Sequence, residues 1–255
     1  HQGREPDDRC VFVERGIEMA AKGDPHYPLR PESADVSEEF REPVARLGKI
    51  ITDRIPIKLG KHEITKDDPE YWAVARLCTD EEAELAIKAF KKIRQPKTFA
   101  DIQKAAPEIP AEKLQKMLDH MSWTGLIEWN YENPQHEKQY VLPMFVPGSG
   151  EFSNMNKDLI EEHPELGMFF EHMTRLPLEK VTPMVPEGGA GIGMHVIPVE
   201  KAIEMNNEAI GIEKISHWLD KYEGKYAKSP CSCRRSRKTY GEGCGDVEDG
   251  WCIAV

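Results

Sequence analysis

The sequence predicts a mainly α-helical chain with a small amount of β-structure, an α+β fold. Apolar residues recur at helical spacing in several segments, and residues 80–146 combine three helical patterns with two strand-like runs. Four of the six cysteines lie in the last 25 residues, which indicates a metal-binding or disulfide-bonded end. With 255 residues, the chain is long enough for about two domains.

Residues 1–79 are expected to be an N-terminal helical segment that packs on the core. A helical repeat over residues 36–52 is carried by Val36, Phe40, Val44, Leu47 and Ile51. Ser37 is a candidate N-cap, and Pro43 is expected to kink or restart this helix. A second short helix is predicted from Tyr71, Trp72, Val74 and Leu77. Cys10 and Cys78 are isolated in sequence, so we interpret both as small packed hydrophobic residues.

Residues 80–146 predict a domain of three helices followed by a β-hairpin. Asp80 is expected to cap the first helix, and Thr98 with Asp101 resembles a capping box that begins the second. Pro110 opens the third helix, whose predicted buried face is Leu114, Met117, Leu118 and Met121. Strand-like runs follow at residues 126–131 and 139–142. Three helices and then a hairpin are typical of a winged-helix domain.

The charge pattern disfavours nucleic acid as a partner. The formal net charge is −11, whereas phosphate backbones attract basic proteins. On the third helix Lys113 and Lys116 are offset by Glu112 and Asp119, so the helix lacks a basic face for base readout. We therefore favour a protein-docking or structural role for the winged helix.

The sequence shows no membrane segment or secretion signal. No apolar run approaches the roughly 18 residues that a membrane span needs, and residues 1–9 are polar. These features predict a reducing, cytoplasmic compartment, which favours thiolates over disulfides.

Residues 147–255 are expected to form a helical segment that ends in a four-cysteine metal-binding loop. Helical patterns are predicted around residues 159–173 and 212–222, and Gly224 is expected to end the second. Because the chain starts at His1 and stops three residues after Cys252, we expect it to be a piece of a longer polypeptide.

The candidate metal and cofactor ligands are Cys231, Cys233, Cys244 and Cys252, in the spacing C-x-C-x10-C-x7-C. Four thiolates can hold a [4Fe–4S] cluster or a zinc ion. Zinc sites usually use paired C-x2–4-C units, so the spacing favours the cluster, with zinc and disulfides as alternatives. If residues 231–233 are extended, both thiols face one side. The cations that lie between the ligands, and that would stabilise thiolates, are Arg234, Arg235, Arg237 and Lys238.

A winged helix followed by residues 229–235 (Ser-Pro-Cys-Ser-Cys-Arg-Arg), with later Cys244 and Cys252, resembles the N-terminal module of large multi-cluster iron–sulfur flavoproteins of anaerobic bacteria. The resemblance implies that the four cysteines are cluster ligands. It also implies electron exchange with a redox partner protein or a downstream ferredoxin-like or flavin domain. A glutamate-synthase-small-subunit-like FAD domain can follow in those chains. This sequence contains no FAD fingerprint, so FAD would belong to parts absent here.

The predicted function is a non-catalytic electron-transfer part of an oxidoreductase. Such a part must hold and tune its cluster and needs no acid–base pair. The sequence shows no nucleophile–His–Asp pattern or H-E-x-x-H motif that would indicate an independent hydrolase. Two alternatives remain: a regulator that senses redox state or iron and binds DNA through the winged helix, and a docking module stabilised by zinc.

Overall fold

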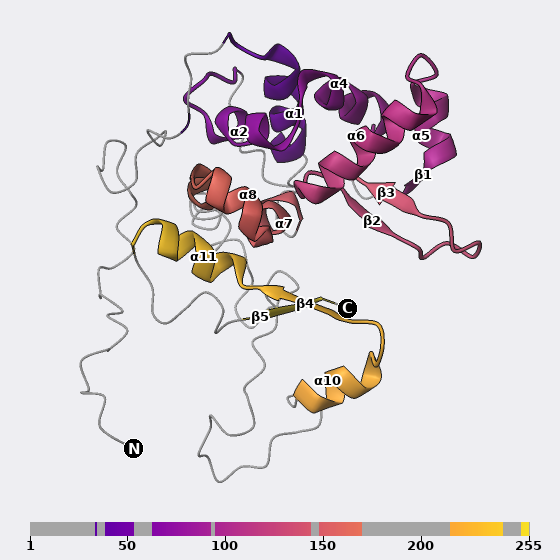
Figure 1. The fold of residues 1–255 in the computed structure, drawn as a ribbon, viewed down its shortest axis with the longest axis vertical. Coiled ribbons are helices and arrows are strands. Elements are labelled where there is room, and N and C mark those ends of the chain that lie inside the picture. The colour runs from indigo at the N-terminus through magenta and orange to yellow at the C-terminus, as the bar shows by residue number, and fades with distance from the viewer. Residues whose placement is uncertain are drawn as a thin grey trace.

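A computed structural model describes residues 34, 39–53, 63–92, 95–143, 148–169, 215–241 and 251–254 (Figure 1). Over these residues the chain is mainly helical with two small antiparallel sheets, which confirms the α+β class. Among the helices described there, none is both long and apolar enough to cross a membrane. Cys10, Ser37, Cys244 and the segment 170–214 lie outside the described residues.

The N-terminal part contains α1 (Glu42–Asp53), α2 (Pro69–Trp72) and α3 (Val74–Leu77). Pro43 does not kink α1, because it lies in the first turn, where the missing N–H has no helical partner to lose. Val44, Leu47 and Ile51 are buried as their spacing predicts. The prediction for Phe40 was wrong: it precedes the helix, is 40% exposed and stacks on Tyr71 with ring centroids 4.8 Å apart.

The middle of the chain forms α4 (Asp80–Ala89), β1 (Lys97–Thr98), α5 (Phe99–Ala105), α6 (Ala111–Trp123), β2 (Glu128–Asn130) and β3 (Gln139–Val141). The cap of α4 is Thr79 rather than Asp80, because the Thr79 side chain accepts the Glu82 N–H and Glu82 accepts the Thr79 N–H. The capping box predicted at Thr98 and Asp101 is confirmed.

The three strands form one antiparallel sheet in the order β1-β3-β2. The hairpin predicted from the sequence is the β2–β3 pair, in which Trp129 lies opposite Tyr140. The two-residue strand β1 adds a third member beside β3. Gly125, at φ +80°, ends the α6 turn in the left-handed region that glycine favours.

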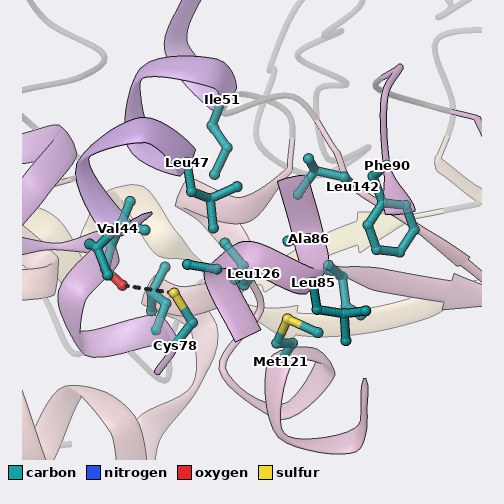
Figure 2. Close-up of a cluster of buried hydrophobic side chains, with 14 of the residues drawn as sticks. Val44, Leu47, Ile51, Cys78, Leu85, Ala86, Phe90, Met121, Leu126 and Leu142 are labelled. Carbon is teal, nitrogen blue, oxygen red and sulfur yellow. Dashed lines mark hydrogen bonds between the residues drawn. The ribbon is translucent and has the colours of Figure 1, made fainter. Parts of the chain in front are cut away.

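One hydrophobic cluster joins α1–α3 to α4–α6 and the sheet. Figure 2 shows Leu47 of α1 near Leu126, and Met121 of α6 beside Leu85 of α4. Cys78 belongs to this cluster, as predicted: its thiol donates to the Val74 carbonyl at 3.5 Å, and burial raises its pKa to about 12. Such a thiol is a packing group and is inert as a nucleophile or ligand.

After the N-terminal helices α1–α3 and the middle of the chain, a third group of helices connects the core to the C-terminal part. It comprises α7 (Ser149–Met155), α8 (Lys157–Glu162) and the helical residues 165–169. Leu159, Leu166 and Phe169 extend the hydrophobic cluster, and Phe169 meets Trp72 edge-on at 6.1 Å. Glu165, only 2% exposed, pairs with Arg76 of α3 at 2.8 Å. This ion pair and the apolar contacts fix the third group against the N-terminal helices.

We predict that Arg76→Ala lowers the free energy of unfolding by about 3 kcal/mol, because it leaves the buried Glu165 carboxylate with only the more distant His163, 3.7 Å away. Urea unfolding followed by circular dichroism measures the loss. Arg46→Ala is the matched control: its pairs with Glu42 and Glu84 are exposed and should contribute less than about 1 kcal/mol. Equal losses for the two variants would show that burial of Glu165 gives this pair no special weight.

Candidate metal centre

The C-terminal sheet brings one predicted ligand back to the other two. Strand β4 (Ala227–Pro230) pairs antiparallel with β5 (Trp251–Ala254), and Ser229 lies opposite Cys252. Side chains two residues apart on a strand share a face, so Cys231, directly after β4, lies diagonal to Cys252 on the face of Ser229. The 21-residue separation is thereby closed by strand pairing.

The extended conformation considered for residues 231–233 holds only for the first of them. Cys231 is extended (φ −72°, ψ 113°) and is the N-cap of α11 (Ser232–Thr239), so Cys233 lies in the first helical turn. The four cations predicted in a loop, Arg234, Arg235, Arg237 and Lys238, are helical instead. Arginine and lysine are good helix formers, and these residues have no glycine or proline among them.

The three described thiols interact with one another. Burial raises the pKa of Cys252 to about 11, helped by the adjacent Cys231 thiol and opposed by a hydrogen bond from the Ser232 N–H. Cys233 is exposed as a residue, but partial covering of its sulfur raises its pKa, and Cys231 again adds to the effect. Cys231 is therefore the central thiol, in contact with one partner from its own turn and one from β5. All three are free thiols.

Helix α7 contributes one carboxylate, that of Glu151, near the thiols. The Glu151 carboxylate of that helix contributes to the raised pKa of Cys233. It also accepts the Gly148 N–H at 2.6 Å, while burial raises its own pKa. A carboxylate near the thiols opposes their ionisation, and the α11 N-terminus favours it.

Three contacts seat α11 against the body of the protein and a fourth supports β4, and sequence reasoning predicted none of these contacts. Asn154 Nδ2 donates to the Ser232 carbonyl at 2.7 Å, and Ser236 Oγ donates to the Gly167 carbonyl at 2.8 Å. A Cβ on Gly167 would lie 2.2 Å from Thr239 Oγ1, so only glycine allows this approach. On the sheet side, Ser229 Oγ donates to the Met155 sulfur at 3.1 Å. The four-residue spacing of Ser232 and Ser236 was the one available signal of a polar buried helix face.

The donor set suits a thiolate-ligated metal centre. Cys233 and Cys252, whose pKa values are raised partly by Cys231, hold their protons in the absence of a cation. A metal that displaces these protons would relieve the repulsion between the thiolates. Within the described ranges no three His, Cys, Asp or Glu side chains are arranged to hold a metal ion. Cys244, the fourth predicted ligand, lies outside those ranges, so the four-cysteine site remains a prediction.

Comparisons with known proteins give no family assignment. No protein-family model matches the chain, and neither a curated protein nor a solved structure is significantly similar to it.

In metal-free, reduced protein we predict that Cys252 alkylation by iodoacetamide keeps rising with pH toward about 11, because only the thiolate reacts and its pKa is about 11. Mass spectrometry of the Cys252 peptide measures the rate from about pH 7 to about pH 11, a range that includes the ordinary thiol pKa. The same peptide in urea is the control, where the rate should level off near the ordinary value of about 8.5. A folded profile that also levels there would contradict the burial of this thiol.

Proposed function

We propose that this chain is an iron–sulfur electron-transfer module whose [4Fe–4S] cluster is held by Cys231, Cys233, Cys244 and Cys252. The observation that carries the proposal is the β4–β5 pairing, which sets Cys252 beside the N-terminal turn of α11. Thiols from two separate segments are near enough there for Cys231 to raise the pKa values of both Cys233 and Cys252. Such a grouping is what a cysteine-ligated cluster needs.

A bound cluster would supply one-electron chemistry, and the chain's own residues would hold and tune it. The Ser232 N–H already donates to the Cys252 sulfur. Hydrogen bonds to cluster sulfurs and nearby positive charge both raise a reduction potential. Helix α11 offers both, since its first-turn N–H groups and its four cations lie in the same eight residues. We therefore expect a potential above that of an equally exposed cluster without them.

For the middle of the chain we propose a winged-helix fold used for protein docking. Its support is the succession α4, α5, α6 and the β1-β3-β2 sheet. The cations of α6 are engaged within the protein, Lys113 with Glu81 at 2.5 Å and Lys116 with Glu112 at 2.7 Å. Cations paired in this way are poorly placed to neutralise phosphates.

The partner we propose is a redox protein or a downstream ferredoxin-like or flavin domain. The hairpin exposes Trp129 and Tyr131, each about half accessible, with Lys138 Nζ 4.7 Å from the Trp129 ring. Exposed aromatic groups are typical of protein interfaces. Any FAD would belong to that partner, and the free thiols are compatible with a reducing, cytoplasmic compartment.

Two other functions would use the same features. A DNA-binding regulator would need the winged helix to bind duplex DNA, and a salt-dependent affinity in a fluorescence anisotropy titration would favour it. A zinc-stabilised docking module would use the same thiols, since three or four cysteines also suit zinc.

We predict that protein purified or reconstituted without oxygen is brown, contains iron and sulfide, and loses its broad visible absorbance on reduction with dithionite. Iron, sulfide and zinc are measured on the sample used for the spectrum. Cys252→Ser should remove most of the absorbance, because it deletes the ligand that β5 contributes. Cys78→Ala, which changes the buried core thiol, should keep it.

Colourless protein with about one zinc per chain would reject electron transfer and support the docking module. Equal loss of colour in Cys252→Ser and Cys78→Ala would mean that the effect comes from folding and not from ligation.

A further inference from the structure

Asn154 makes an unusual contact with the candidate site. It lies in the last turn of α7, is fully buried, and donates its Nδ2–H to the Ser232 carbonyl at 2.7 Å. Ser232 is itself buried and lies between the two cysteines of the C-x-C pair. The two residues are 78 positions apart, so this bond links separate parts of the chain.

The direction of this hydrogen bond is fixed by chemistry. A carbonyl oxygen only accepts, so the carboxamide must present its nitrogen, since the reversed side chain would bring two oxygens together. The Asn154 Oδ1 is then buried without a hydrogen-bond partner among the described residues. Burying an amide oxygen without a hydrogen bond costs stability. The presence of Asn at this position therefore suggests that the hydrogen bond donated by its nitrogen has a role beyond stability.

We propose that Asn154 is a positioning residue for the thiol site, and this inference rests on the metal centre proposed above. The Ser232 carbonyl and the Cys233 N–H belong to one planar peptide, so holding the oxygen fixes the orientation of the whole group. That group opens the turn that carries Cys231 and Cys233. One side chain thus orients the backbone within the C-x-C pair, and Cys231 of this pair acts directly on Cys252.

The hydrogen bond from Asn154 to the Ser232 carbonyl is not needed merely to attach α11 to the rest of the protein. The helix is also held by Ser236 Oγ on the Gly167 carbonyl and by the close approach of Gly167 to Thr239. Both contacts lie one to two turns farther along α11. Loss of the Asn154 donor should therefore leave the helix seated and free only its first turn.

The test compares Asn154→Ala and Asn154→Leu with Asn156→Ala. Leu removes the donor and has the same branched arrangement of heavy atoms in a somewhat larger side chain, so an effect shared by both variants does not arise from a cavity. Asn156 is a matched control two residues away: its Nδ2 donates to the Trp123 carbonyl at the same 2.7 Å and makes no bond to the site. It also caps α8, so its loss sets a baseline for general destabilisation.

Metal-free, reduced protein is titrated with Cd²⁺ without oxygen, and the thiolate-to-metal ultraviolet absorption reports binding. Circular dichroism checks the fold of each variant. We expect the Asn154 variants to bind Cd²⁺ about 10- to 100-fold more weakly, the usual effect of losing a group that orients ligands. Asn156→Ala should bind like the wild type. The wild type and the variants are also reconstituted with iron and sulfide, and their reduction potentials are compared.

Unchanged Cd²⁺ affinity and potential in a folded Asn154 variant would overturn the positioning role, as would an equal loss in Asn156→Ala. If Cd²⁺ binding depends on Asn154 while the wild type assembles no iron cluster, the electron-transfer function fails and the positioning role stands. A wild type that binds neither metal rejects both. If Asn154→Ala unfolds, the folded Asn154→Leu decides the outcome.

Discussion

The pairing of β4 with β5 is the constraint on which the C-terminal architecture depends. Without it, Cys252 would have no fixed relation to the turn that holds Cys231 and Cys233. A two-stranded sheet is marginal in water by itself, so it needs support from its surroundings. The contacts of Ser229 with Met155 and of Asn154 with Ser232 provide this support from α7. The site is thus built by the sheet and α7 together.

Helix α7 can play that part because the hydrophobic core reaches it. Leu159 and Leu166, just beyond it, join the cluster that begins in α1, and the Arg76–Glu165 pair adds a polar link to α3. The short elements β4, β5 and α11 that form the site are therefore supported by helices that belong to the main hydrophobic core. A metal bound at the proposed site would contribute to the folding of the outer part, since a thiolate site does not exist in the unfolded chain.

Apolar periodicity made much of the core predictable. The buried face of α6 and the capping box at Thr98 follow directly from residue type and spacing. Helix α11 was missed because its buried face is Ser232, Arg235 and Ser236, which show no apolar repeat. The cysteine spacing identified the thiols, whereas nothing local could connect Asn154 to a residue 78 positions away.

The three described thiols differ in their access to solvent. Cys233 is exposed, whereas Cys231 and Cys252 are each partly covered. An ion arriving from solution, or one handed over by a delivery protein, would meet Cys233 first and reach its neighbours only after shedding more of its water. Metal binding would then follow an order: the exposed Cys233 would coordinate the ion first and, on release, would be the last ligand to dissociate.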